Sequence, residues 1–197
     1  MIRNILITLS LLFTLSCIGQ EDLIKTVQNY IITKYYNNFN EVLFISVNEQ
    51  KMYHIIDDEI INSYIVSTSK YGTGNKERSN KTPTGLHKIK QKFGDNTPIN
   101  GRMIGRVFDG DIATIFTDNT KSKTDDVTSR IFWLDGLENG FNKGEGIDSY
   151  KRYIYIHGTS EEGRLGEPAS HGCIRMKNKE IIELYKKIKI GTLVLIL

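Results

Sequence analysis

The chain has 197 residues, of which 39% are hydrophobic and 25% are charged, and its formal net charge is +3. This length fits one compact domain, and this composition is that of a globular protein rather than a disordered one. A net charge this small, with no basic run interleaved with aromatic residues, argues against a nucleic-acid partner.

The first residues predict an export signal over residues 1–19. Arg3 gives a positive start, and an apolar core from Ile5 to Leu15 is followed by small residues. The segment is too short and ends too abruptly for an ordinary transmembrane helix. Cleavage before Cys17 would leave a lipid-anchored cysteine, whereas cleavage after Gly19 would leave a soluble protein. We favour the lipoprotein, and we expect membrane contact only through the signal or the lipid anchor.

Export leaves Cys173 as the single cysteine of the mature chain, because Cys17 is either lipidated or removed. No disulfide can then form within one chain, although exported proteins often meet an oxidising compartment. An unpaired cysteine in an exported protein indicates a reactive thiol or an intermolecular partner. The alternative is a buried apolar cysteine, which is common.

Helical spacing of apolar residues predicts an amphipathic helix over Glu21–Tyr36, inside a lead-in at 20–40 that precedes a domain at 41–197. Runs of β-branched and aromatic residues predict strands at Val42–Val47, Met52–Ile56, Ile60–Val66, Leu86–Ile89, Ile112–Phe116, Ile131–Leu134, Tyr153–Ile156 and Leu193–Ile196. Loops of a length that is often functional are expected at Ser67–Lys81, Thr117–Ser129 and Gly136–Ser149.

A second helix is predicted after Asn178, which we expect to cap it, and before Gly191, which we expect to end it. Its apolar face consists of Ile181, Ile182, Leu184, Tyr185 and Ile188. The sequence therefore predicts a mainly β domain with an N-terminal helix and one late helix.

The stretch Tyr155–Met176 carries the candidate chemistry. A strand ending at Ile156 delivers His157, and a loop then leads to Cys173. A thiol with a pKa of about 8.5 is only slightly ionised at neutral pH, so a nucleophilic cysteine needs a neighbouring imidazole, and His157 and His171 are both candidates. Glycines beside such residues allow the backbone to approach a substrate and present N–H groups to an oxyanion.

At these residues the sequence resembles the L,D-transpeptidase catalytic domain family, also called YkuD. The segment HGT, then about a dozen residues, then SHGCIRM resembles the signature of that family. EVLFISVNEQKMYHI resembles its opening hairpin, KTPTGLHKI its TP-x-G turn and MKNKEIIELYKKIKIGTLVLIL its closing helix and strand. The resemblance covers Glu41 to Leu197 and implies a β-sandwich-type catalytic domain. His87 departs from the family, where an aromatic residue is common.

The resemblance implies that Cys173 is the nucleophile and that His157 is the base that activates it. The backbone carbonyl of Gly158 would orient His157. His171, Gly172 and Cys173 would surround the oxyanion, largely with backbone N–H groups.

Three further positions are expected to support the site. Arg175 would stabilise it or meet a substrate carboxylate, with a plain structural ion pair as an equal alternative. Ser170 is expected to fix the loop by a hydrogen bond, and His171 has a structural alternative as well. We expect His54 and His87 to be ordinary strand residues, and Tyr153 and Tyr155 to pack in a strand.

The implied reaction is a pair of acyl transfers on peptidoglycan, which would serve cell-wall biogenesis and cell shape. The thiolate attacks the third residue of a stem tetrapeptide, D-alanine leaves, and a thioester remains. The acyl group then passes to an amine acceptor, which the sequence leaves open: another stem, a D-amino acid or a protein lysine. No metal or other cofactor is implied, and we expect a monomer in the periplasm or cell envelope.

Three alternatives use the same residues. A cell-wall cysteine peptidase or L,D-carboxypeptidase would use Cys173 and His157 with water as the acceptor. A zinc site could be built from His157, His171 and Cys173, although their spacing is not that of usual zinc ligands. A non-catalytic wall-binding module is disfavoured, because binding alone needs no activated thiol.

Overall fold

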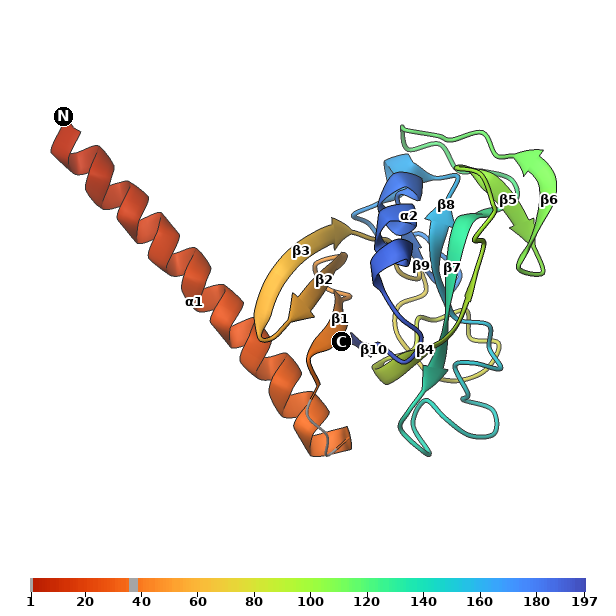
Figure 1. Cartoon of the computed structure of the whole chain (residues 1–197), viewed down its shortest axis with the longest axis horizontal. Coiled ribbons are helices and arrows are strands. Elements are labelled where there is room, and N and C mark those ends of the chain that lie inside the picture. Colours follow the sequence, from red (N-terminus) through yellow and green to blue (C-terminus); the bar gives the residue numbers. More distant parts are fainter. Residues whose placement is uncertain (1, 36–38) are drawn as a thin grey trace.

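The structure is a computed structural model, and it describes residues 2–35 and 39–197. Two α-helices, one 3-10 helix and ten strands follow one another along this part of the chain (Figure 1). Their bounds are α1 Ile2–Tyr35, β1 Glu41–Ser46, β2 Lys51–Ile56, β3 Glu59–Ile65, β4 Gly85–Phe93, β5 Gly101–Ile104, β6 Val107–Ile112, β7 Val127–Gly136, β8 Tyr155–Thr159, η1 Glu162–Arg164, β9 Ile174–Met176, α2 Asn178–Lys187 and β10 Leu193–Ile196.

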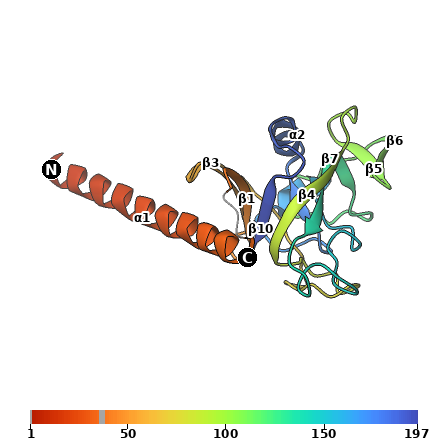
Figure 2. The ribbon, with the colours of Figure 1, turned by 60° about the horizontal axis from the view of Figure 1, so that its bottom comes forward.

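The strands form one hydrogen-bonded sheet in the order β3-β2-β1-β10-β4-β7-β5-β6, and β8 and β9 branch from β7. The late strand β10 lies between β1, to which it is parallel, and β4, to which it is antiparallel. Residues of β1 and β2 meet residues of β8 and β9 in one apolar core. Figure 2 shows β1, β10, β4 and β7 side by side, with α1 extending away from them. The predicted mainly β fold with an early and a late helix is confirmed.

Both faces of β1 are buried, which explains its continuous apolar run. Leu43 and Ile45 point into the core between the two halves of the sheet. Val42 and Phe44 point to the opposite face, into a second apolar cluster. Alternate residues of a strand face opposite sides, so a strand covered on both sides has no polar face.

Helix α2 covers the first core. Its residues Ile181, Leu184 and Tyr185 are buried there, and the Tyr185 ring stacks on Phe132 at 5.5 Å between centroids. The prediction that Asn178 caps the helix is wrong, because Lys177 occupies that position and Asn178 is the first helical residue. The Asn178 side chain is instead buried among strand ends and loops, where it forms the hydrogen bonds described with the site.

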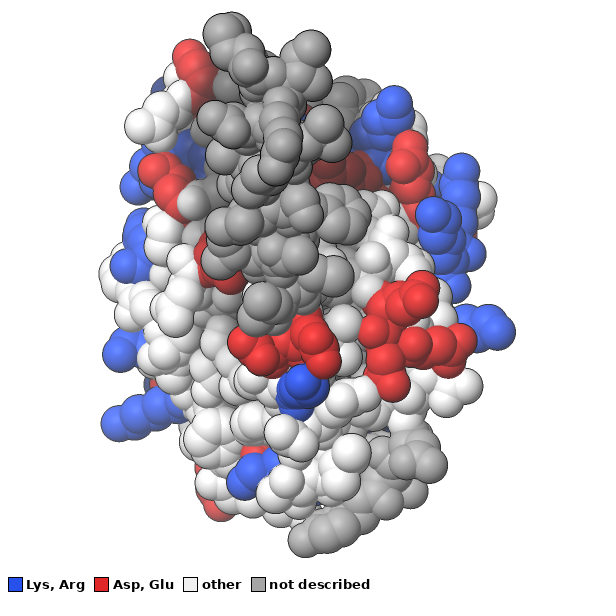
Figure 3. Space-filling view, turned by 90° about the vertical axis from the view of Figure 1, so that its left-hand side faces the viewer, with Lys and Arg blue, Asp and Glu red and all other residues white. Residues whose placement is uncertain are grey.

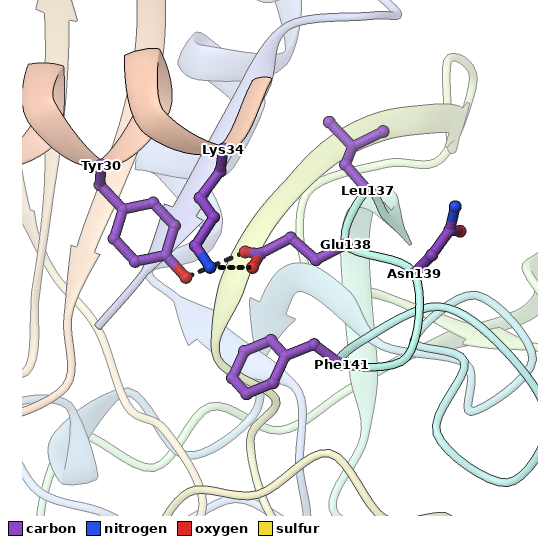
Figure 4. A pocket seen from close by; sticks show the side chains of 6 residues that line it. All are labelled: Tyr30, Lys34, Leu137, Glu138, Asn139 and Phe141. Atoms are coloured by element: carbon purple, nitrogen blue, oxygen red, sulfur yellow. Dashed lines mark hydrogen bonds and ion pairs between the residues drawn. The ribbon is translucent and has the colours of Figure 1, made fainter. Parts of the chain in front are cut away.

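Helix α1 covers the second cluster with its C-terminal half, where Val27 and Ile31 are buried. Figure 4 shows Tyr30 and Lys34 pointing from this helix towards Glu138, in the loop after β7. The Tyr30 hydroxyl donates to Glu138 at 2.9 Å, and Lys34 pairs with the same carboxylate at 3.9 Å. These residues border a cavity of about 430 Å³.

The N-terminal half of α1 projects away from the sheet in both ribbon views. Among the described residues, no helix is long and apolar enough to cross a membrane. Seen from the α1 side, the surface carries mostly uncharged side chains, with small groups of acidic and basic ones between them (Figure 3).

Two strand predictions are wrong. The strand expected at Ile112–Phe116 ends at Ile112, where β6 ends. The residues after it run along the surface, and Phe116 donates its N–H to the Ser160 carbonyl at 2.8 Å instead of joining the sheet. The strand expected from Tyr153 begins at Tyr155, because Tyr153 has a positive φ of 58° that a strand does not tolerate.

Candidate active site

Two neighbouring parallel strands carry the predicted catalytic pair. In the register of β8 and β9, His157 lies opposite Arg175. Side chains two residues apart on a strand share a face, so Cys173, just before β9, lies on the same face as Arg175 and His157. The pairing therefore places the thiol and the imidazole on one side of the sheet, as diagonal neighbours.

The His157 ring is buried and held in one tautomer. Its Nδ1 lies 2.7 Å from the Gly158 carbonyl oxygen, which can only accept a hydrogen bond, so Nδ1 carries the proton. Burial lowers the pKa of the imidazole to about 4. The ring is consequently neutral at physiological pH, with its lone pair on Nε2, and Nε2 forms no hydrogen bond within residues 39–197.

Gly158 sits where no side chain fits. A Cβ there would lie 2.5 Å from Asn178 Oδ1 and 2.7 Å from the Thr128 carbonyl oxygen. The Asn178 oxygen also accepts hydrogen bonds from the hydroxyls of Thr128 and Ser129, both at 2.6 Å. The close approach of α2, β7 and β8 fixes the carbonyl that orients His157.

The Cys173 thiol is partly exposed and bonds to the backbone at the start of β8 and just before it. Its Sγ donates to the Tyr153 carbonyl and accepts from the Tyr155 N–H, both at 3.4 Å. Burial among neighbouring groups raises the pKa of the thiol to about 11, although the Tyr155 N–H opposes this shift. The resting thiol is therefore protonated.

The turn before the thiol is held by its own hydrogen bonds. The Ser170 hydroxyl donates to the Cys173 carbonyl at 2.6 Å and accepts from the Gly172 N–H at 3.2 Å. Thr82 donates its hydroxyl to the Gly172 carbonyl at 3.0 Å. Gly172 has a φ of 127°, which favours glycine, so this residue allows the sharp turn that exposes the thiol.

The His171 ring bonds to the loop before β7, which carries Asp125. Its Nδ1 lies 2.6 Å from a carboxylate oxygen of Asp125, and its Nε2 lies 3.0 Å from Lys70 Nζ. Because the lysine can only donate, Nε2 accepts and Nδ1 donates to Asp125. Both ring nitrogens are thus occupied by protein groups.

Arg175 is buried and paired with two carboxylates. One terminal nitrogen donates to Glu161 at 2.8 Å and the other donates to Asp125. Arg175 also bonds through its backbone to Ser67, at 2.9 and 3.0 Å. Both terminal nitrogens are thus engaged by protein carboxylates, whereas the buried Nε has no partner among the described residues, so the terminal nitrogens form a structural ion pair.

Asp125 and Glu161 were missed by the sequence analysis, and no motif marks either residue. Burial raises the pKa of Asp125, but the Arg175 guanidinium and the His171 hydrogen bond lower it more, so the net shift is downward. Asp125 stays ionised and joins His171 to Arg175. The loop that carries it was predicted only as a polar loop of unknown role.

An aromatic cluster packs beside the thiol. Trp133 stacks on Tyr150 at 4.1 Å and on Tyr153 at 5.5 Å between centroids, and meets the edge of Tyr155 at 5.5 Å. Arg106, from the β5–β6 hairpin, lies 4.6 Å above the Trp133 ring. Tyr153 therefore packs on Trp133 while remaining 56% exposed, outside the strand in which it was expected.

The predicted zinc alternative finds no support in the donor geometry. Within residues 2–35 and 39–197, no group of three or more His, Cys, Asp or Glu side chains is arranged to hold a metal ion. His54 bonds to Glu41 at 2.8 Å, and His87 bonds to Gly85 and Ser149, both at 2.9 Å. The two His87 contacts hold β4 against the loop that carries Ser149 and do not form a metal site.

A buried neutral imidazole and a partly exposed thiol lie on one face of paired strands, and these are the two groups that a cysteine–histidine acyl-transfer site requires. The model of the L,D-transpeptidase catalytic domain, YkuD, matches residues 40–196. The chain therefore belongs to this family of acyltransferases, whose members act on peptidoglycan stem peptides of the cell wall.

Curated relatives match over short segments. "Putative L,D-transpeptidase YqjB" of Bacillus subtilis is 51% identical over 45 residues, which are 23% of this chain and 26% of that protein. "Probable L,D-transpeptidase YbiS" of Escherichia coli is 42% identical over 41 residues, 21% of this chain and 13% of that protein. These matches span about a quarter or less of the relatives' own length.

One solved structure shows the same fold at low identity, and a second is similar more distantly. The structure titled "Structure of the Ldtfm-avibactam carbamoyl enzyme" superposes with a TM-score of 0.50 and 16% identity, over 81% of this chain and 49% of that one. An L,D-transpeptidase from Mycobacterium smegmatis has a TM-score of 0.48 and 14% identity, over 80% and 58% of the two chains.

Proposed function

We propose that this protein is a peptidoglycan L,D-transpeptidase in which Cys173 is the nucleophile and His157 the general base. The observation that carries this proposal is the tautomer of His157: its Nδ1 proton is held by the Gly158 carbonyl, which leaves the Nε2 lone pair free on the face that also carries the partly exposed thiol. Family membership supports the substrate class, a stem tetrapeptide of peptidoglycan.

In the first half-reaction the Cys173 sulfur bonds to the carbonyl carbon of the third stem residue, and the thiol proton passes to His157 Nε2. The carbon–nitrogen bond to D-alanine then breaks, and the imidazolium returns the proton to the leaving amine. A thioester remains on Cys173. In the second half-reaction an amine attacks the thioester carbonyl, loses a proton to His157, and releases the thiol.

The pKa values decide the order of proton transfer. A thiol pKa of about 11 and an imidazole pKa of about 4 make the resting pair neutral. The proton is therefore transferred during attack on the carbonyl rather than beforehand. Such general-base assistance contributes roughly 10²–10⁴-fold to a rate.

The tetrahedral oxyanion needs N–H donors near the thiol. The backbone N–H groups of Gly172 and Cys173 are the candidates, and the Gly172 hydrogen bond to Ser170 Oγ is long at 3.2 Å, so it can be exchanged at small cost. A single oxyanion donor contributes about 10²–10³-fold to the rate. Ser170, Gly158, His171 and Arg175 act by holding the turn, the imidazole and the neighbouring loop.

The test is incubation of the protein with a tetrapeptide muropeptide, followed by intact-mass measurement and product analysis. The mass of the protein should rise by the acyl group, and the Cys173→Ala variant should show no adduct. An adduct on that variant would refute Cys173. Products with and without an added amine separate transfer from hydrolysis, which is the alternative L,D-carboxypeptidase or peptidase activity at the same residues.

We also propose that residues 1–19 direct export, that 20–40 form a lead-in and that 41–197 form the catalytic domain. Activity on peptidoglycan requires export to the periplasm or envelope, and the docking of Val27 and Ile31 on the domain supports a short fixed lead-in. Cys17 is the proposed lipidation site. Incorporation of labelled palmitate should occur in the wild type and be lost in Cys17→Ser, and a monomer is expected in solution.

A further inference from the structure

A cavity of about 240 Å³ lies beside the turn that carries the thiol. Tyr153, whose carbonyl accepts the hydrogen bond of the thiol, lines it, and so does His171, two residues before Cys173. At about 30 Å³ for each water, the volume corresponds to roughly eight waters, which is space for a single amino-acid residue. The cavity is thus placed to hold a group next to the bond that Cys173 attacks.

The lining of this cavity is strongly basic. Arg78, Lys151 and Arg152 face it, and Glu77 is the one carboxylate among its lining residues. The Arg78 side chain is 93% exposed and its contact with Glu77 is long, at 4.0 Å. The excess of positive charge favours an anionic occupant.

Arg152 is the fixed member of the set. Its two terminal nitrogens donate to the carbonyls of Gly74, at 3.1 Å, and Lys81, at 2.6 Å. Both acceptors are uncharged, and Arg152 forms no ion pair with any residue that the structure describes. A partly buried guanidinium whose charge is unpaired gains most from a carboxylate, because charge-assisted hydrogen bonds are about twice as strong as neutral ones.

A comparison with Arg175 shows why Arg152 is the arginine with charge available for an anionic ligand. Arg175 already has two carboxylate partners, whereas Arg152 has none. Burial lowers the pKa of Arg152, and the charges of Cys173 and Glu77 oppose that shift without forming a hydrogen bond or an ion pair with the guanidinium in the described part of the chain.

We propose that this basic cavity binds a carboxylate of the acyl donor, with Arg152 as the anchor and Lys151 and Arg78 as supporting charges. The inference rests on the proposed function and assigns part of the donor to a surface. Two carboxylates of a stem tetrapeptide lie near the scissile bond: the terminal carboxylate of the leaving D-alanine, and the side-chain carboxylate of the third residue where that diamino acid carries one. Either source supplies the same chemistry.

The test is peptide binding to the full chain carrying Cys173→Ala, measured by calorimetry, so that no chemistry is needed. Three tetrapeptides are compared: one with both carboxylates free, one amidated at D-alanine and one amidated at the side chain of the third residue. Arg152→Gln is made in the same background. Lys151→Gln is a second variant, since Lys151 is exposed and makes no side-chain hydrogen bond in the described part of the chain. Lys186→Gln, on the exposed side of α2, is the control for charge.

Arg152→Gln should weaken binding of the free peptide roughly tenfold to a hundredfold, the range for losing a hydrogen bond to a charged group. Lys151→Gln should weaken it by a few-fold and Lys186→Gln should leave it unchanged. One amidated peptide should bind weakly to the Cys173→Ala parent, and Arg152→Gln should not weaken its binding further. The carboxylate that is amidated in that peptide is the one that Arg152 binds.

The proposal would be overturned if Arg152→Gln weakened the binding of all three peptides equally. It would also be overturned if neither Arg152→Gln nor Lys151→Gln weakened the binding of the free peptide. An absence of peptide binding to the parent would overturn it as well. A wild-type protein that binds the peptide in this Arg152-dependent way but never forms a thioester would refute the proposed reaction and leave the binding site standing.

Discussion

The Asp125 carboxylate accepts a hydrogen bond from the buried Arg175 guanidinium, and this contact ties the loop between β6 and β7 to β9. The other oxygen of Asp125 accepts from His171, just before the turn that carries the thiol. One side chain from a distant polar loop therefore holds both ends of the Cys173 segment.

Asp125→Asn should destabilise the protein by about 1–3 kcal/mol, because the buried guanidinium loses a charged partner. Acylation of Cys173 should also slow, since the turn is less well fixed. Urea unfolding and single-turnover acylation measure the two effects. Asp126→Asn is the matched control, because Asp126 makes no side-chain hydrogen bond within residues 39–197. Equal effects of the two substitutions would contradict the role of Asp125.

Asp125 should also make stability depend on acid pH. Its folded-state pKa is lowered, so its contribution is fully present above the unfolded value of about 3.9 and is lost as the pH falls through the folded pKa. The Asp125→Asn variant should therefore lose less stability than the wild type below pH 4. The measurement is the free energy of unfolding against pH for the wild type and for Asp125→Asn. The same decrease below pH 4 in both proteins would show that Asp125 does not titrate as the ion pair requires.

His87 should weaken the fold at mildly acidic pH. Burial lowers its pKa to about 4, below the unfolded value of about 6.5, so its contribution is complete above pH 6.5 and is lost as the pH falls towards 4. The shift corresponds to about 3 kcal/mol. His157 titrates in the same window, so His87→Phe should remove about half of the loss measured by urea unfolding at pH 7.5 and pH 4.5. A loss equal to that of the wild type would contradict this.

The thiol should be poorly reactive without its base. With a thiol pKa of about 11, the thiolate fraction at pH 7 is very small, and the rate of alkylation by iodoacetamide should rise about tenfold per pH unit between pH 7 and pH 10. Acylation by substrate should instead persist through neutral pH and fall as the pH drops through about 4, where His157 becomes protonated. His157→Gln should slow acylation roughly 10²–10⁴-fold. An alkylation rate that is already maximal at pH 7 would show a preformed thiolate.

The docking of α1 can be measured with two adjacent isoleucines. Ile31 is fully buried against the sheet, whereas Ile32 is 54% exposed. Ile31→Ala should cost about 2–5 kcal/mol of unfolding free energy, and Ile32→Ala should cost little. Equal costs would mean that the helix does not pack on the domain in solution.

The sequence predicted the parts of the fold that carry a long apolar signal. The run predicted at Val42–Val47 forms β1, which ends at Ser46, and the segment Leu193–Ile196 forms β10, because continuous apolar residues fill both faces of the sheet. β9 was not predicted, since its three residues Ile174–Met176 are too few for a periodic signal. Asn178 was predicted as a cap from residue type alone, but tertiary hydrogen bonds to Thr128 and Ser129 decide its place.

The motif brought His157 and Cys173 to attention, but it does not identify the charged residues around them. Asp125 and Arg152 come from other loops, and Glu161 lies in the spacer between the two parts of the motif, so only the folded chain brings them to the site. The role of a polar loop residue depends on which buried charge it meets, which sequence spacing does not encode.

The place of β10 has a consequence for folding. β1 and β4 meet only through this strand, which is the last of the described strands to be synthesised. Until it arrives, the hairpin side of the sheet and the catalytic side are separate pieces, each with an open backbone edge that invites pairing with other chains. The two halves of the sheet therefore gain a continuous ladder of backbone hydrogen bonds only once β10 has docked between them.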